Sequence, residues 1–597
     1  MEERALRRGG TWSQAGRVSP KVLAWLGVIG AVVLGVVIVN VYLKGHQTLH
    51  IVNGWSVPVK VSIDGGSAED VPARTRHAVP IAEGRHRAVV TRAGAPEEAI
   101  EFDVCNTFFQ RVFSKSVFVL NPGGAATLLW QEIVYGDESA RPEYRLRYGK
   151  SYLIYRDINY VFEEAPDEIT TESSKETRHQ VATFFGAPSA IVDEFPAKGR
   201  PGTQLGFCEH HLKLTPGDTD LLDAYAAIAG QCDESVRCLK FLSKGLARRP
   251  VIMPWHRAYQ DMCVVGKKTG GLAAEYDKML KAEPDSSPLL YLRGRLEPTI
   301  TGAAGYYDRS IAADDKNPFP LAGKGFLLLA RCEFTAARDL LTKAAGLGLD
   351  SARVRHLLFE ARFASGDHVA LEAETAAALV KSPLGFALHR RLLALLAVQG
   401  KLNAAATAQK AYAKAIRAEI DDDPYDIVLQ SELMWLYLKG DFQTMLKKAR
   451  SRQDPEARNW LLYSIHLELG DLKRADAALC KAGEEPDPDD CLLMSLGWRQ
   501  KGDAARAAAW RQKAVESYRG GSLDTKAVAE LLKKGDGLTL ADVDEIAMAP
   551  WDKSIVLTAL AAECPSQRSG LLERARKLNY GPLVPHRVLK RFIENMK

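Results

Sequence analysis

The tripeptide Gly149-Lys150-Ser151 has the residue types that end a phosphate-binding loop. That loop also needs a glycine five residues earlier, where this sequence has Tyr144, and a helix directly after it. The segment that follows is aromatic and strand-like instead. The sequence therefore argues against nucleotide binding at this position.

Metal binding is the second chemistry that short motifs suggest. Residues 209–211 (Glu-His-His) offer ligand types, but adjacent side chains point to different faces of a helix and lack the i, i+4 partner of a zinc helix. We expect a solvated helix face there. The acidic runs at 421–423 and 484–490 lack the order and the glycine of a calcium loop, which favours caps between repeats. The sequence predicts no metal and no cofactor.

Covalent catalysis has no recognisable motif. The sequence contains no Gly-x-Ser-x-Gly and no evident set of nucleophile, base and orienting residue. We therefore predict that the chain is not an enzyme. The nine cysteines are an odd number, so at least one is unpaired within the chain. Cys480 and Cys491 are expected at facing ends of consecutive helices and are the best disulfide candidates; buried free thiols are the alternative.

Composition limits the class of protein. The chain has 597 residues, 46% of them hydrophobic, which is enough for about four domain-sized units with real cores. Its 79 basic and 74 acidic residues give a net charge of +5, too close to neutral for a protein that binds nucleic acid through a basic surface. We therefore predict no nucleic-acid partner.

Residues 22–43 form an uncharged, apolar stretch near the N-terminus. As a helix it reaches about 33 Å, enough to cross a hydrocarbon core of about 30 Å. A cleaved signal peptide has a shorter apolar region and a small-x-small cleavage site, whereas this stretch ends in Val41-Tyr42-Leu43-Lys44. We predict an uncleaved, single-pass transmembrane helix.

Basic residues predict the orientation of this helix. Arg7, Arg8, Arg17 and Lys21 precede it, against Lys44 and Lys60 in the comparable window after it. Because basic flanks stay inside, residues 1–21 are expected in the cytoplasm and the bulk of the chain outside the plasma (inner) membrane. 

Small residues also repeat along this helix. Gly27, Ala31 and Gly35 form a small-xxx-small face through which two copies of the helix could pack as a homodimer.

Residues 44–162 alternate apolar and polar side chains, as in half-buried strands, with glycine-rich turns between them. Asn121-Pro-Gly-Gly divides the long apolar run 116–135 into two short strands. A small antiparallel β-sandwich is expected. The run "VSIDGG…VPIAEGRHRAVVT" resembles the PEGA-like sandwich modules that follow membrane anchors. That resemblance implies either carbohydrate or peptide binding or, as we favour, a spacer. The polar stretch 163–207, with its prolines, is expected to be a linker.

A glycine followed by a polar residue recurs in the C-terminal half, and its positions are Gly366, Gly400, Gly440, Gly470 and Gly502. The intervals are 34, 40, 30 and 32 residues. This pattern resembles the tetratricopeptide (TPR) family, whose unit is a helix-turn-helix of about 34 residues. Consensus-like small or bulky positions are Ala303, Tyr307, Gly325, Ala337, Leu341 and Ala344.

We therefore expect about eight TPR-like units in residues 208–518. The 40-residue interval implies a longer helix or loop near 411–423. Residues 519–597 are expected to form a helical cap, in which Thr539 and Asp542 have capping-box spacing. The predicted fold class is thus a mixed multidomain chain with one transmembrane helix, a small β-sandwich and an all-α solenoid.

The TPR resemblance implies that the first helix of each unit lines a concave groove. The spacing of the turn glycines places six residues there: Arg353, His356, Arg390, Gln430, Tyr437 and Trp460. The function that follows is a membrane-anchored, extracytoplasmic scaffold in the cell envelope that binds a protein or peptide. The alternative is a surface enzyme or carbohydrate-binding protein with its site in the β module or at its junction with the repeats.

Overall fold

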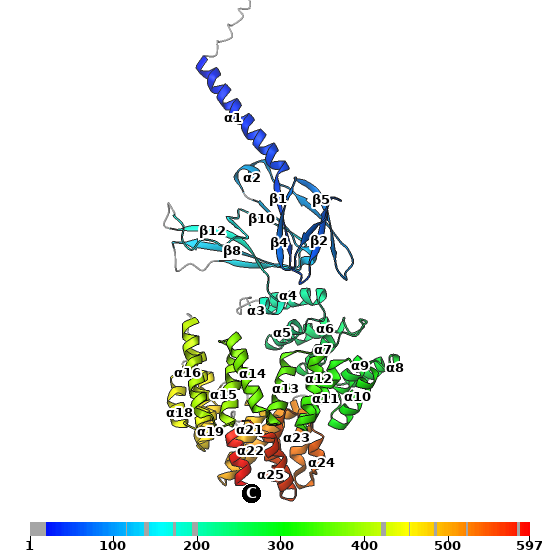
Figure 1. Cartoon of the computed structure of the whole chain (residues 1–597), viewed down its shortest axis with the longest axis vertical. Coiled ribbons are helices and arrows are strands. Elements are labelled where there is room, and N and C mark those ends of the chain that lie inside the picture. Colours follow the sequence, from blue (N-terminus) through cyan, green and yellow to red (C-terminus); the bar gives the residue numbers. More distant parts are fainter. Residues whose placement is uncertain are drawn as a thin grey trace, which may run out of the picture. The chain divides into compact units, whose positions relative to one another are not determined.

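The computed structural model describes residues 20–114, 116–136, 143–170, 175–193, 201–419, 425–452, 454–482, 486–520, 523–581 and 586–596. It divides the chain into two compact units, Met1–Glu234 and Ser235–Lys597. The predicted cytoplasmic segment lies outside the described residues up to position 19. Each unit is described by itself below (Figure 1).

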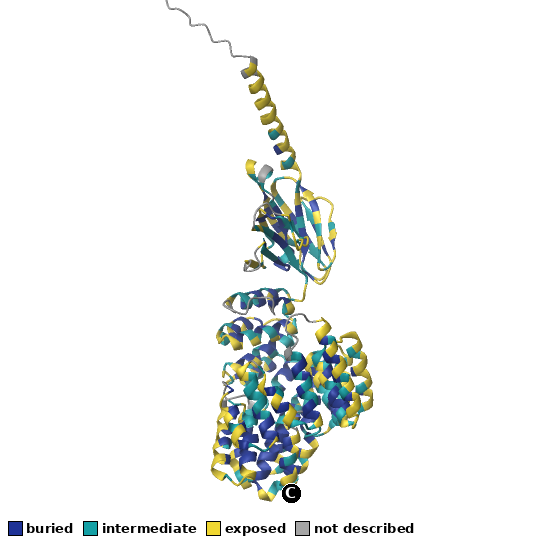
Figure 2. Cartoon of the chain, turned by 90° about the vertical axis from the view of Figure 1, so that its left-hand side faces the viewer, coloured by how far each residue is buried: buried dark blue, intermediate teal, exposed yellow. Residues whose placement is uncertain are grey.

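Unit 1 begins with the helix α1 (Pro20–Gly45). Its 22 residues Ala24–Gly45 are long and apolar enough to cross a membrane, and Figure 2 shows that nearly all of this helix is exposed. Gly27, Ala31 and Gly35 all lie on its exposed surface. His46 alone separates α1 from the first strand, so the connection between them is a single residue long.

The β region that follows contains twelve strands in the described residues. They are β1 (Gln47–Asn53), β2 (Val59–Ile63), β3 (Glu69–Val71), β4 (Thr75–Ile81), β5 (Gly84–Arg92), β6 (Glu98–Val104), β7 (Ser116–Leu120), β8 (Thr127–Tyr135), β9 (Tyr144–Arg147), β10 (Tyr152–Arg156), β11 (Tyr160–Val161) and β12 (Glu176–Phe184). A short helix, α2 (Phe108–Phe113), precedes β7, and the 3-10 turn η1 (Pro122–Gly124) separates β7 from β8 as expected.

These strands form three four-stranded sheets, in the orders β10-β7-β1-β4, β3-β2-β5-β6 and β11-β12-β8-β9. The small β region is confirmed, but it is not purely antiparallel, because β1 pairs with β7 and β11 with β12 in parallel. Strand β7 joins β1 only after the chain has built β2 to β6, so it can enter the sheet in the same direction.

The first of these sheets is buried on both faces. On β7, Phe118 and Leu120 belong to a core shared with the β2–β5 sheet, whereas Val117 and Val119 belong to a second core shared with β8 and β12. A strand buried on both faces needs a continuous apolar sequence. This explains why the run that starts at Ser116 is as apolar as a membrane segment.

The predicted linker 163–207 is wrong, because much of it is ordered secondary structure. It contains β12, the helix α3 (Pro188–Asp193) and the first half of α4 (Pro201–Leu214), which is followed by α5 (Thr219–Gln231). Strand β12 pairs with all nine residues of β8. Its sequence, Glu-Thr-Arg-His-Gln-Val-Ala-Thr-Phe, is polar at most positions, and Val181 alone of these nine lies in the hydrophobic core. Hydropathy therefore gave no strand signal.

Unit 2 begins with α6 (Ser235–Ser243) and continues in eight helix pairs of the described chain. The first helices are α7 (Met253–Val265), α9 (Ser287–Gly294), α11 (Pro318–Ala330), α13 (Ala352–Ala364), α15 (Phe386–Val398), α17 (Tyr425–Lys439), α19 (Pro455–Glu468) and α21 (Pro488–Gln500). The second helices are α8 (Leu272–Ala282), α10 (Ile300–Ala313), α12 (Phe334–Gly346), α14 (His368–Lys381), α16 (Leu402–Glu419), α18 (Phe442–Arg450), α20 (Leu472–Leu479) and α22 (Ala504–Gly520).

The local signals that predicted these pairs are confirmed. All five turn glycines have a positive φ, between 72° and 84°, which is costly for other residues. The longer repeat interval corresponds to α16, which has 18 residues. Ala337, Leu341 and Ala344 are fully buried on α12, and a Cβ on Gly325 of α11 would lie 2.8 Å from the Cγ of Leu341. The two helices thus cross at a distance that only glycine allows.

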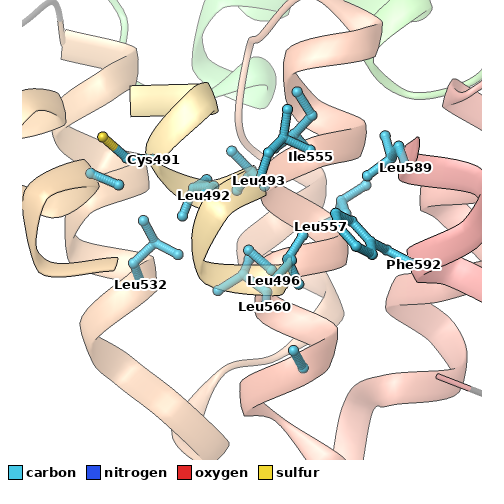
Figure 3. Close-up of a cluster of buried hydrophobic side chains, with 14 of the residues drawn as sticks. Cys491, Leu492, Leu493, Leu496, Leu532, Ile555, Leu557, Leu560, Leu589 and Phe592 are labelled. Atoms are coloured by element: carbon cyan, nitrogen blue, oxygen red, sulfur yellow. The ribbon is translucent and has the colours of Figure 1, made fainter. Parts of the chain in front are cut away.

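After the pairs come α23 (Leu523–Lys534), the turn η2 (Gly535–Gly537), α24 (Leu540–Asp544), α25 (Pro550–Glu563), the turn η3 (Pro565–Gln567), α26 (Arg568–Leu578) and α27 (His586–Asn595). Thr539 and Asp542 form the expected capping box at the start of α24. Figure 3 shows how α21, α23, α25 and α27 share one core, in which Leu493, Leu532, Ile555 and Phe592 are buried. The C-terminal helices therefore cover the last repeats with a continuous apolar interface.

Candidate functional site

The six residues predicted for the concave groove all lie on first helices of the pairs. Arg353 and His356 are on α13, Arg390 is on α15, Gln430 and Tyr437 are on α17, and Trp460 is on α19. Each of them lines at least one hollow of unit 2. These hollows lie along the first helices, which we call the first-helix wall; that a ligand binds there stays a prediction.

Arg353, His356 and Arg390 come together in a hollow of about 420 Å³. All three residues are exposed, and none of them forms a hydrogen bond or an ion pair with a described residue. Aromatic side chains complete the lining, from Phe359 on the same wall and from Trp551 and Tyr580 of the C-terminal region. The hollow thus combines cationic groups with apolar surface.

Positive charge extends from this hollow toward α7. Arg353 also lines a neighbouring hollow of about 160 Å³, together with Arg257 and Arg295. Desolvation by the surrounding wall, and then the charges of Arg295 and Arg257, lower the pKa of Arg353 below its ordinary value. Arg295 is paired with Asp261 at 2.7 Å, while the Nε of Arg257 is buried without a partner. An anionic group placed among these arginines would relieve their mutual repulsion.

Gln430 and Tyr437 line a second hollow of about 280 Å³, which Arg390 also borders. Tyr437 itself is only 2% exposed. Its hydroxyl donates to Glu468 at 2.7 Å, and the guanidinium of Arg587 on α27 lies 5.8 Å from its ring centre. Tyr437 is therefore part of the wall, but α27 covers it.

The C-terminal helices occupy this wall at several points. The hydroxyl of Tyr580 donates to Glu360 of α13 at 2.7 Å. Arg587 donates to the carbonyl oxygen of Leu438 at 2.8 Å, and Arg591 donates to that of Leu467 at 2.8 Å. The predicted cap thus contacts first helices well before the end of the array, as well as its last repeats.

Trp460 lines a third hollow of about 380 Å³, in which acidic groups replace the arginines. Asp487, Asp490 and Glu468 line it with Trp460 and Trp551. Burial raises the pKa of Asp490 to about 6 and holds the pKa of Glu468 above its ordinary value. The wall is therefore cationic near α13 and acidic near α21.

The expectation of a solvated face at residues 209–211 is wrong for both histidines. His211 is 4% exposed, and burial lowers its pKa to about 4. His210 lies in contact distance of Gly149, and its Nε2 is 3.1 Å from the carbonyl oxygen of Gly124. Both glycines have positive φ, and a Cβ on Gly149 would lie 3.3 Å from Nδ1 of His210, so this glycine makes room for the imidazole. Helix α4 is thereby packed on the β region.

Two further predicted sites can be placed. Cys480 and Cys491 are free thiols; Cys480 is exposed and points to Asp476, while Cys491 is buried and points to the carbonyl of Pro486. The disulfide stays a prediction. Among the residues that the structure describes, no three His, Cys, Asp or Glu side chains gather in a group that could hold a metal ion.

Comparisons with known proteins add little to this picture. No family model matches the chain, and no curated protein matches it. Among solved structures, the chain is similar to the human IFIT1 dimer with PPP-AAAA, at 13% identity and a TM-score of 0.28, over 66% of this chain and 93% of that one. It is similar to the APC/C hetero-tetramer Cut9-Hcn1, at 12% identity and a TM-score of 0.23, over 68% and 94%.

The P58(IPK) TPR domain is a third similar structure, at 13% identity and a TM-score of 0.16, over 58% of this chain and 97% of that one. Because these scores are low, the fold assignment depends on the helix pairs themselves. They define a TPR-like helical solenoid, which follows a β region and an apolar helix along the chain. The PEGA resemblance of the β region stays a prediction.

Sequence reasoning missed Arg257 and Arg295, because single arginines on amphipathic helices look like solvated surface. Only the position of each arginine within its repeat could have predicted that both line the hollow. It also missed the covering of Tyr437, which depends on α27, about 150 residues further along the chain.

Proposed function

We propose that the chain is a membrane-anchored, extracytoplasmic scaffold that binds a protein or peptide along the first-helix wall of its repeats. Arg353, His356 and Arg390 form no hydrogen bond or ion pair with a described residue and share one hollow with aromatic side chains, and this observation carries the proposal. A folded protein rarely leaves such groups together in a recess unless a ligand uses them.

The chemistry of the hollow suits a peptide segment with a carboxylate next to an apolar side chain. Guanidinium groups pair with carboxylates in a bidentate geometry, and exposed aromatic faces receive apolar groups. Arg390 borders two hollows, so an extended ligand could continue from one into the other.

Membrane anchoring is proposed from α1. Its apolar surface is exposed, it has the length of a span, and basic residues are more frequent before it than after it. In the proposed topology, residues after Leu43 lie outside the cytoplasm. The small-residue face of Gly27, Ala31 and Gly35 is free of other described atoms around both glycines and could pair two copies.

Chemical crosslinking in intact membranes tests the scaffold, with the full chain compared with a chain that ends at Glu234. We expect partners to be captured by the full chain and lost with the truncated one. Capture that persists without the repeats would place the binding site in unit 1 and favour the alternative of a carbohydrate-binding or catalytic β module.

A further inference from the structure

Asn40 is a buried polar residue in a helix whose other side chains are largely exposed. It is 5% exposed, and both ends of its amide group are paired with the segment around α2. Its Nδ2 donates to the carbonyl oxygen of Phe108 at 2.9 Å, and its Oδ1 accepts from Arg111 at 2.7 Å. Helix α2 is therefore held against α1 at the level of Asn40.

The turn between β4 and β5 completes this junction. Arg111 donates to the two carboxylate oxygens of Glu83 at 2.7 and 2.6 Å, and the two side chains are 15% and 5% exposed. The backbone N–H of Glu83 donates to the carbonyl oxygen of Lys44 at 2.8 Å. A bidentate, shielded ion pair fixes geometry well, so the end of α1, the turn and α2 form one rigid junction.

The position of Asn40 along α1 sets its depth in a membrane. Counted from Lys21, the last basic residue before the apolar run, Asn40 comes after about 30 Å of helix, which equals the hydrocarbon thickness of a typical bilayer. Asn40 and the ion pair beside it would then lie where the hydrocarbon ends and the lipid headgroups begin. Polar groups are tolerated at this level.

Exposed apolar side chains surround this level. Phe109 is 70% exposed and Phe108 is 41% exposed, while Val41 and Tyr42 on α1 are 67% and 60% exposed. Among the side chains of the β region that the structure describes, no other large apolar one is as exposed as Phe109. Aromatic side chains at the headgroup level are typical of proteins that rest on a bilayer.

We propose that Phe108 and Phe109 insert into the headgroup region of the bilayer and, with Val41 and Tyr42, seat the β region directly on the membrane. This inference depends on the proposed anchoring by α1. In this arrangement the Asn40–Arg111–Glu83 junction fixes the orientation of the β region on the lipid surface, so the β region is not a spacer that moves freely.

Photo-crosslinking to lipid tests this contact in the full chain, reconstituted in vesicles of phosphatidylcholine and phosphatidylglycerol. The photoreactive residue p-benzoylphenylalanine replaces Phe109, Val57 or Val33 in three separate variants, and lipid adducts are measured by mass spectrometry. Val57 is the matched control, since it is exposed but lies beyond the far end of β1, whose seven residues extend about 23 Å. Val33 reports on α1 itself.

We expect lipid adducts at positions 33 and 109 and several-fold fewer at position 57. Adducts at position 33 without adducts at 109 would overturn the seating of the β region and leave the anchor intact. Equal adducts at 57 and 109 would overturn it as well, because contact would not be specific to α2. The lack of adducts at position 33 would contradict membrane anchoring, and the inference would fall with it.

Discussion

The close crossing of α11 and α12 makes a prediction about two substitutions that depend on each other. A Cβ on Gly325 would lie 2.8 Å from Cγ and 3.0 Å from Cδ2 of Leu341, and Leu341 is fully buried. Gly325→Ala alone gains about 1 kcal/mol of helix propensity but overpacks the crossing at a cost of about 1 to 3 kcal/mol. We expect it to be neutral or destabilising.

Leu341→Ala alone opens a cavity and should cost about 2 to 5 kcal/mol. In that background the clash no longer exists, so Gly325→Ala should stabilise by about 1 kcal/mol. The sign of the second substitution therefore changes, and the coupling between the two should be about 1 to 3 kcal/mol. Ala337→Leu, beside the same crossing, should cost about 1 to 3 kcal/mol.

Hydrogen exchange on the full chain in detergent measures these effects as protection of residues 321–365. Arg338→Ala is the matched control, because Arg338 on the same helix is only partly buried and forms its ion pair with the adjacent, exposed Asp339. This change should alter stability by no more than about 0.5 kcal/mol. The predicted packing would be refuted if Gly325→Ala were equally destabilising in both backgrounds, or if Arg338→Ala were the more damaging change.

Three further predictions concern α27, the acidic hollow and the orientation of the chain. Arg591→Ala removes the donors to two carbonyl oxygens, so it should increase hydrogen exchange in α27 at a cost of about 1 to 3 kcal/mol. Lys590 is exposed, so Lys590→Ala should not increase exchange. Equal effects of the two changes would contradict the contact between Arg591 and α19. Because the folded pKa of Asp490 is about 6, above its ordinary value of 3.8, the folded state binds more protons in this range. Stability should therefore fall as pH rises from about 4 to 6, and Asp490→Asn should flatten that slope in urea denaturation; an unchanged slope would refute the assignment. The exposed Cys105 should react with a membrane-impermeant maleimide from outside the cell, and reaction only after permeabilisation would reverse the proposed topology.

The sequence predicted elements whose signal is local. The uncharged run of α1 and the turn glycines each depend on a few neighbouring residues, and both are found as expected. Strand β12 was missed because it is polar and owes its order to nine pairs with β8. The buried state of His211 was missed because it depends on the tertiary packing of α4, for which the local sequence gives no signal.

The candidate site likewise has features with a local sequence signal and features without one. The position of a residue within its repeat was enough to place Arg353, His356 and Arg390 on one wall. It could not show that the C-terminal helices return to that wall, since the bond between Tyr580 and Glu360 joins residues 220 positions apart. Contacts of this kind have no local sequence signal.

Photo-crosslinking from the first-helix wall tests most directly the claim that a protein or peptide binds there. The residue p-benzoylphenylalanine replaces His356 in the cationic hollow or, as the control, Val380 on α14, which is 83% exposed and lines none of the hollows described above. In intact membranes we predict a protein or peptide adduct at position 356, absent at 380 and lost when Arg353→Glu and Arg390→Glu are added. Equal adducts at both positions, or adducts at 356 that survive the charge reversal, would contradict binding through this wall.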